Sequence, residues 1–261
     1  DGVRGVANSD LTCNLAHTLG QATVQFAGKK ILIAKDTRLS GDMLEDSVAA
    51  GIMSMGGDAL LAGVIPTPAV PYLLRELDCD GAVMITASHT PPEYNGIKIF
   101  DSQGYKLPDH TEDLIEDMIL SGRKPSDVPR GDAVGTKRYI DDARERYIDF
   151  AVSTVKDSGI DFKGLKVALD TGHGASSNTS PEAFKRLGAE VTVINDDFSG
   201  TDINVNCGST HLEQVSTLVK NIKADIGIAH DGDADRVLLI DKNGKEIDGD
   251  FMMAVCAYEL Y

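Results

Sequence analysis

The stretch Gly81–Phe100, GAVMITASHTPPEYNGIKIF, joins two apolar runs through a polar turn. The first run has the length of a buried strand and ends in the tetrapeptide TASH, which contains Ser88 and His89. The second run carries a single lysine, Lys98. Polar residues at the mouth of a buried strand either form a turn or act on a ligand, and the rest of the sequence must decide between these two roles.

Segments typical of strands and of helices alternate along the whole chain. KKILIAKD (29–36) and LKVALD (165–170) are short apolar runs, whereas residues 40–55 have their apolar side chains at helical spacing. This alternation predicts an α/β fold with sheets covered by helices. A polar helix is predicted from Tyr139 to about Lys156, and a domain boundary at 152/153.

Composition excludes several classes of protein. Hydrophobic residues make up 42% of the 261 residues, which indicates a folded globular chain, and the net charge of −16 argues against a nucleic-acid-binding surface. No segment approaches the roughly 20 apolar residues of a membrane span. The cysteines Cys13, Cys79, Cys207 and Cys256 form no CxxC pair. We therefore expect reduced thiols and a cytoplasmic protein, with no disulfide framework or structural zinc.

The segment DGDADR (231–236) carries the strongest chemical signal. In extended backbone, Asp231, Asp233 and Asp235 would project to one side, and three carboxylates in one place favour a bound hard cation. An EF-hand calcium loop is excluded, because Arg236 and Lys242 occupy the positions that need glycine and glutamate. Mg²⁺ is predicted instead, with Arg236 beside an anionic group that completes the shell. A merely solvated acidic loop is the alternative.

Ser88 can be interpreted in the same chemical terms. A serine at a strand end is usually a turn former or a helix cap. Here His89 can exchange a proton near neutral pH, Lys98 lies on the returning strand, and Arg4 lies in the glycine-flanked segment DGVRG. Together these residues predict a phosphoryl-transfer site, where catalysis depends on positioning and charge neutralisation.

The absence of two motifs argues against two classes of enzyme. The chain contains neither the G-x-S-x-G elbow of α/β-hydrolases nor the Walker phosphate loop. A dinucleotide-binding protein remains an alternative, because Gly172 and Gly174 follow a strand and Asp196 and Asp197 end the next one. Ser177 occupies the position of the third glycine, so a tight turn is the simpler interpretation.

These segments, in this order, resemble a known family. DGVRG (1–5), TASHTPPEYNGIKIF (86–100) and DGDADR (231–236) are similar to the opening, phosphoserine and metal motifs of the α-D-phosphohexomutases. INVNCGSTHLEQ (203–214) is most similar to the bacterial phosphoglucosamine mutase branch. The resemblance covers essentially the whole chain.

The resemblance implies an isomerase that interconverts glucosamine 6-phosphate and glucosamine 1-phosphate for cell-wall precursor synthesis. A phosphorylated Ser88 would transfer its phosphoryl group to the sugar, and the bisphosphate would reorient and return its other phosphate. The implied ligands of one Mg²⁺ are Ser88, Asp231, Asp233 and Asp235, and the other implied catalytic residues are Arg4, His89 and Lys98. A phosphoglucomutase or phosphomannomutase of the same family is the alternative, and a non-catalytic metal-binding module is a more distant one.

The resemblance also implies a domain organisation. The family has four domains, and the expectation is that residues 1–152 and 153–250 form the first two, with mixed, mostly parallel sheets. Residues 251–261 would be the first helix of a third domain, and the chain would be truncated there. A protein of these 261 residues alone is therefore expected to turn over little substrate. The sequence leaves the oligomeric state open.

Three residues depart from the family pattern. Thr90 stands where the family usually has Asn, and Pro92 follows Pro91, changes expected to adjust loop hydrogen bonds without removing Ser88. Ala234 replaces a usual Gly between two implied metal ligands. This replacement is tolerable if the backbone at Ala234 has a negative φ, and costly otherwise.

Overall fold

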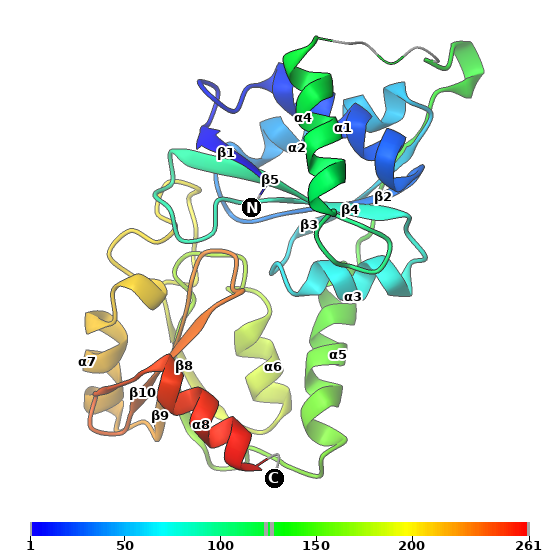
Figure 1. Cartoon of the computed structure of the whole chain (residues 1–261). Helices are drawn as coiled ribbons and strands as arrows, with labels where there is room; N and C mark the ends of the chain where they lie inside the picture. Colours follow the sequence, from blue (N-terminus) through cyan, green and yellow to red (C-terminus); the bar gives the residue numbers. More distant parts are fainter. Residues whose placement is uncertain (1, 123–124, 126–127, 260–261) are drawn as a thin grey trace.

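The computed structural model describes residues 2–122, 125 and 128–259. The chain forms two α/β units, one above the other in Figure 1, each built on its own sheet. The first sheet has six strands in the order β1-β5-β4-β2-β3-β6, and the second has five in the order β11-β10-β9-β7-β8. Both sheets are mixed. The prediction of two tandem α/β domains is confirmed.

The first unit alternates strands with helices. Its elements are β1 (Val3–Val6), α1 (Cys13–Ala27), β2 (Lys30–Lys35), α2 (Gly41–Ser54), β3 (Asp58–Val64), α3 (Ala69–Glu76), β4 (Gly81–Ile85), β5 (Tyr94–Phe100), α4 (Asp109–Leu120) and β6 (Lys137–Tyr139). Helices α1, α2 and α4 cover one face of the sheet, and α3 covers the other. The central strands are apolar on both sides because both faces are covered.

The second unit begins with a helix shared between the two. Its elements are α5 (Ala143–Lys156), β7 (Lys166–Asp170), α6 (Ser180–Arg186), β8 (Glu190–Ile194), α7 (Glu213–Ile222), β9 (Ile226–His230), β10 (Val237–Asp241), β11 (Glu246–Ile247) and α8 (Gly249–Glu259). Ala143 of α5 packs in the core of the first unit, whereas Ile148 and Val152 pack against α6. The predicted boundary at 152/153 therefore falls inside a continuous helix, and its position stays a prediction.

One local expectation needs correction. The predicted helix from Tyr139 begins only at Ala143, because Tyr139 pairs with Leu61 as the last residue of an edge strand. After the aspartate segment the chain forms a hairpin, β10 and β11, whose turn contains Gly244 with φ of 80°.

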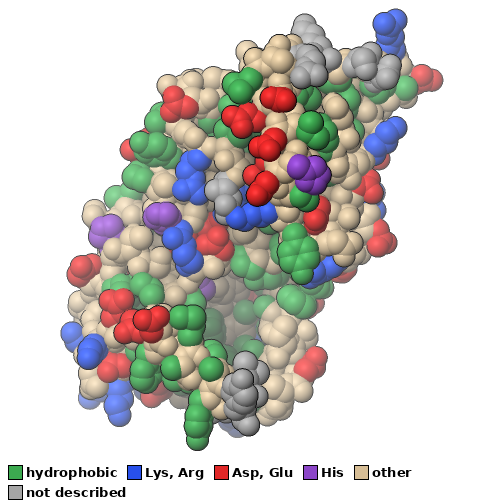
Figure 2. All heavy atoms as spheres, in the orientation of Figure 1, with side chains coloured by type: hydrophobic (Ala, Val, Ile, Leu, Met, Phe, Trp, Pro, Cys, Tyr) green, Lys and Arg blue, Asp and Glu red, His purple; other side chains and the backbone are tan. Residues whose placement is uncertain are grey.

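Helix α8 follows the second sheet and exposes apolar side chains. Phe251, Met253 and Tyr258 are all more than half exposed, and Figure 2 shows green side chains on this part of the surface. Acidic side chains gather over α4 in the same view. The predicted assignment of 251–261 to a third domain is untested, and residues 260–261 lie outside the described ones. Among the described residues, no helix has both the length and the apolar character needed to cross a membrane.

The carboxyl ends of parallel strands from both sheets point toward the junction between the two units. Loops after β2, β3 and β4 meet loops after β7 and β9: Thr37 donates a hydrogen bond of 2.6 Å to the His173 carbonyl, and Thr67 one of 2.7 Å to the Asp233 carboxylate. In α/β proteins, ligands bind at this edge of a sheet. The fold therefore brings two such edges to one place.

Helices α1 and α2 contact each other through glycines. A Cβ added at Gly51 would lie 2.1 Å from the His17 carbonyl oxygen, and one added at Gly20 would lie 2.3 Å from the Val48 carbonyl oxygen. The two backbones can approach this closely only because neither position carries a side chain.

We predict that Gly51→Ala lowers the free energy of unfolding by about 2 kcal/mol, because the new methyl group overpacks the α1–α2 contact. At an exposed helix position the same change would stabilise by about 1 kcal/mol. Urea unfolding measures the effect. Ala50→Gly on the exposed side of α2 is the control, with an expected loss of about 1 kcal/mol from helix propensity alone. A Gly51→Ala protein more stable than the parent would contradict the packing account.

Candidate active site

Ser88 lies in the loop that follows β4 and points across to the second unit. Its backbone is left-handed, with φ of 54°, and its amide donates a 2.9 Å hydrogen bond to the Thr86 hydroxyl. The Ser88 hydroxyl donates to a carboxylate oxygen of Asp231 at 2.8 Å, and the residue is only 4% exposed. A left-handed conformation is unfavourable for serine, so the surrounding structure holds this side chain against Asp231.

The three aspartates of DGDADR lie together in the turn between β9 and β10. One carboxylate oxygen from each of Asp231, Asp233 and Asp235 lies within 4.8 Å of the others. The expectation of extended backbone was wrong: the Ala234 amide donates to the Asp231 carbonyl at 3.0 Å, which closes a turn. The turn achieves the same convergence of side chains, with Asp231 and Asp233 fully buried.

Ala234 has a positive φ, the backbone conformation that is costly for alanine. Its φ is 54°, in the left-handed region that glycine occupies without strain. For other L-residues this region costs about 1–2 kcal/mol. The alanine therefore stores strain inside the turn that carries the aspartates.

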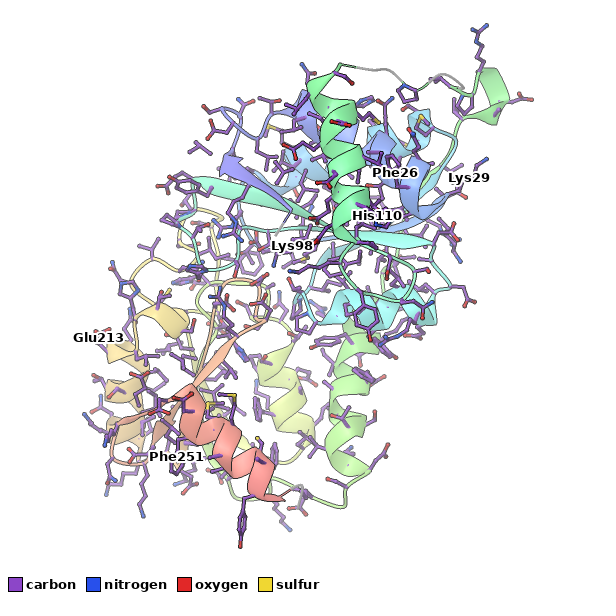
Figure 3. The ribbon with its side chains drawn as sticks, viewed as in Figure 1. Phe26, Lys29, Lys98, His110, Glu213 and Phe251 are labelled. Atoms are coloured by element: carbon purple, nitrogen blue, oxygen red, sulfur yellow. The ribbon has the colours of Figure 1, made fainter. Side chains whose placement is uncertain are left out.

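Lys98 and Thr67 from the first unit both contact Asp233. The Lys98 ammonium lies 2.9 Å from one Asp233 oxygen and 3.6 Å from Asp235, and the Thr67 hydroxyl donates to the same Asp233 oxygen at 2.7 Å. Figure 3 labels Lys98 on the side of the first sheet that faces the second unit. The charge of Lys98 offsets part of the carboxylate charge.

Arg236 joins the serine, the histidine and the triad. Its guanidinium donates two hydrogen bonds to Asp231, at 2.8 and 3.1 Å, and further ones to the Ser88 hydroxyl and to Nδ1 of His89, the latter at 2.6 Å. The Arg236 side chain is half exposed, at 51%. It is therefore accessible to an anionic ligand at the mouth of the site.

The two buried carboxylates differ in their tendency to ionise. Burial raises the pKa of Asp231 above its ordinary value, and the charge of Asp233 raises it further. Burial also opposes the ionisation of Asp233, but the charge of Lys98 and hydrogen bonds from Lys98 and Thr67 outweigh it and lower that pKa. Asp233 is thus the more stable anion, and Asp231 is the one that an added cation would relieve most.

Arg4 lies on β1, the strand of the first sheet that pairs with β5, and does not contact the triad. It faces Gly96 across the β1–β5 ladder and is exposed. Because Gly96 and Lys98 are two residues apart on β5, the side chains of Arg4 and Lys98 project from the same face of the sheet. Among the described residues Arg4 has no hydrogen-bond or ion-pair partner, and its catalytic role stays a prediction.

The geometry of the triad fits a hard cation. One oxygen of Asp233 is buried and has no hydrogen-bond partner among the described residues. A buried carboxylate oxygen without a partner is unfavourable, and an ion bound among the three carboxylates would satisfy it. Aspartates with a serine hydroxyl offer only oxygen ligands, the donor set that suits Mg²⁺.

The glycines at 172 and 174 have a structural use in this fold. A Cβ at Gly174 would lie 2.4 Å from the Gly232 carbonyl oxygen, and the Ala175 amide donates to that oxygen at 2.8 Å. The glycine loop therefore packs directly onto the aspartate turn. This contact accounts for Gly174, and the left-handed φ of 60° accounts for Gly172, without a dinucleotide.

Sequence reasoning missed four residues that support the site: Asp36, Arg38, Thr67 and Asn204. Arg38 is buried, pairs with Asp36 at 3.0 Å and donates to the loop of Ser88. A charged pair directly after a buried strand, in AKDTR, was the available signal for these two residues. Thr67 carried none, and Asn204 lies in the segment INVNCGSTHLEQ without any sign of its contact, because only the contact between the two units gives either residue a role.

Comparison with known proteins agrees with this geometry. The model of domain I of phosphoglucomutase/phosphomannomutase, an alpha/beta/alpha domain, matches residues 1–126, and that of domain II matches residues 137–244. The chain belongs to the phosphoglucomutase/phosphomannomutase family. The resemblance inferred from DGVRG, TASHTPPEYNGIKIF and DGDADR is thereby confirmed.

Curated relatives in this family include phosphoglucosamine mutases. Those of Clostridium acetobutylicum and Ruminiclostridium cellulolyticum are 50% and 51% identical to this chain over 98% of its length. The chain spans 58% of the length of each.

Solved structures of the family share the fold. A phosphoglucomutase/phosphomannomutase family protein from Burkholderia thailandensis is 25% identical, with a TM-score of 0.82 over 99% of this chain and 57% of its own. The parafusin phosphoglucomutase of Paramecium is 17% identical, with a TM-score of 0.66 over 93% of this chain and 52% of its own.

We predict that Ala234→Gly raises the free energy of unfolding by about 1 kcal/mol, because glycine adopts the left-handed backbone without strain. Chemical denaturation of the metal-free protein measures this gain. Ala50→Gly, where the backbone is helical, should lose stability by a similar amount. A loss of stability in Ala234→Gly would show that the turn is not strained.

We also predict that Asp231→Asn stabilises the metal-free protein at pH 7, by about 1 kcal/mol. Because the folded-state pKa of Asp231 is raised, its ionised form destabilises the fold once the pH rises above the unfolded pKa and through the folded one. The gain should disappear toward about pH 4, where the carboxyl is protonated.

Unfolding curves in the presence of a chelator test this pH dependence. Asp235→Asn is the matched control, with a smaller expected effect because Asp235 is partly exposed. A gain from Asp231→Asn that is independent of pH would contradict the electrostatic explanation.

Proposed function

We propose that the protein carrying this chain is a phosphoglucosamine mutase, which interconverts glucosamine 6-phosphate and glucosamine 1-phosphate through a phosphoserine and a bisphosphate intermediate. The observation that carries the proposal is the 2.8 Å hydrogen bond between the Ser88 hydroxyl and Asp231, inside a cluster of three aspartates. The aminated sugar is suggested by the relatives at 50–51% identity. The role in cell-wall precursor synthesis that the sequence resemblance implied, and the cytoplasmic location expected from the sequence, belong to the same proposal.

Ser88, Asp231, Asp233 and Asp235 would hold one Mg²⁺. When bound, the ion would offset negative charge on the transferring phosphoryl group and on the buried aspartates. The partnerless oxygen of Asp233 and the raised pKa of Asp231 support this assignment.

In the first half-reaction, Ser88 carries the phosphoryl group. A sugar hydroxyl attacks phosphorus, so that a new O–P bond forms while the bond from Ser88 Oγ to phosphorus breaks. In the second half-reaction, Ser88 Oγ attacks the other phosphate of the reoriented bisphosphate. The proton released by each attacking hydroxyl must be accepted, and the departing oxygen must receive one, so each half-reaction conserves charge and protons.

Four residues would support the transfer by charge and proton exchange. Arg236 already donates to the Ser88 hydroxyl, so its guanidinium is placed to contact oxygens of a phosphate on Ser88. Lys98 donates to Asp233, which favours a charge-stabilising role. Because Nδ1 of His89 accepts from Arg236, a neutral His89 ring carries its hydrogen on Nε2, which would donate a proton to the departing oxygen. Arg4 would add positive charge on the same face.

Phosphosite mapping tests the proposal. Incubation with a hexose 1,6-bisphosphate and Mg²⁺ should add one phosphate, located on Ser88 by mass spectrometry. Ser88→Ala should abolish the added phosphate, Asp233→Asn should slow its formation about 100-fold or more, and Ser102→Ala on an exposed turn should leave it unchanged. Phosphate on another residue, or none on the longest protein that carries this sequence, would refute the mechanism.

A comparison of substrates then distinguishes a phosphoglucosamine mutase from a phosphoglucomutase or phosphomannomutase. Turnover that prefers glucosamine phosphates over the glucose and mannose phosphates supports the proposed sugar. The reverse preference would assign the protein to the phosphoglucomutase or phosphomannomutase activity.

A further inference from the structure

The loop that carries Ser88 is held by its carbonyl oxygens. Arg38 donates to four of them, and its side chain is completely buried beside Asp36. The accepting carbonyls belong to Ser88, Thr90, Pro91 and Tyr94. The distance from the guanidinium nitrogen is 2.9 Å to the Ser88 oxygen, 2.8 Å to that of Thr90 and 2.9 Å to that of Tyr94. The Arg38 guanidinium thus fixes the loop from within the first unit.

A second donor reaches the same loop from the other unit. The side-chain amide nitrogen of Asn204 donates to the Ser88 carbonyl at 2.9 Å and to the Thr90 carbonyl at 3.3 Å. Asn204 is only 8% exposed, and its own amide donates to the Gly172 carbonyl at 3.0 Å. The second unit therefore contacts Ser88 at two groups: Asp231 and Arg236 bind its hydroxyl, and Asn204 binds its carbonyl.

Apart from these two hydrogen bonds, the asparagine at this position has two destabilising features. Its φ is 60°, which glycine would adopt with less strain, and its side-chain oxygen is buried without a partner among the described residues. Both features are unfavourable for the fold. What the asparagine supplies is a neutral donor for two carbonyls, which adds no charge beside the aspartates.

We propose that Asn204 is a positioning residue for phosphoryl transfer. By holding the Ser88 and Thr90 carbonyls, it keeps Ser88 in its left-handed conformation with the hydroxyl directed at Asp231. Asn204 acts through the loop, because the groups that it contacts are backbone carbonyls. Its effect on the rate rests on the proposed function, whereas its effect on the loop can be measured independently.

Two variants distinguish the effect of losing the Asn204 side-chain amide from the effect of placing glycine in a left-handed backbone. Asn204→Gly removes the donor and keeps the left-handed backbone. Asn206→Gly, in the same turn with φ of 54° and an exposed side chain, makes the same backbone change away from the loop.

The first measurement is hydrogen–deuterium exchange of peptides covering residues 86–95. We expect exchange about fivefold faster in Asn204→Gly and unchanged in Asn206→Gly. Unchanged exchange in Asn204→Gly, or the same increase in both variants, would overturn the proposed hold on the loop.

The second measurement is the rate of Ser88 phosphorylation by a hexose 1,6-bisphosphate with Mg²⁺. Asn204→Gly should lower the rate at saturating donor about tenfold and leave the half-saturating donor concentration unchanged, because the nucleophile and not the donor site is displaced. An unchanged rate would overturn the catalytic part of the proposal. Absence of phosphorylation in the parent protein would instead refute the proposed function, and the exchange result would still decide whether Asn204 holds the loop.

Discussion

Asp231 and Asp233 are both fully buried, and with Asp235 they bring three carboxylate oxygens within 4.8 Å of one another. Like charges in a region of low dielectric repel strongly, so this arrangement exists only where cations compensate for it. Lys98 reaches the cluster from the first unit and Arg236 from the turn itself. The junction between the two units is therefore more than a packing contact: the first unit supplies part of the charge that lets the turn of the second unit fold.

The two turns that meet there both contain a strained residue. Ser88 and Ala234 have nearly the same left-handed φ, one in the loop after β4 and the other between two aspartates. Neither residue type favours this conformation, and each is held by hydrogen bonds from its surroundings. A serine fixed in this way loses little conformational freedom when it receives or donates a phosphoryl group. The strained backbone therefore lowers the stability of the fold but holds Ser88 in position before the reaction.

The sequence predicted the parts of the molecule that depend on local patterns. The apolar run GAVMI, the helical spacing of residues 40–55 and the convergence of the three aspartates each depend on neighbours in sequence, and the structure contains all three. Extended backbone at 231–235 was wrong, because a hydrogen bond across the turn decides that geometry. The contact between Asn204 and Ser88 could not have been predicted, since the two residues lie 116 positions apart in the sequence. Long-range contacts of this kind have no local signature.

Crystallography with Mn²⁺ in place of Mg²⁺ would test the central claim, which is that Ser88 and the three aspartates form one metal site. Anomalous scattering should show one ion contacting oxygens of Asp231, Asp233 and Asp235 together with an oxygen of Ser88 or of its phosphate. An ion bound by the aspartates while Ser88 points away, or an ion bound elsewhere in the molecule, would contradict the account.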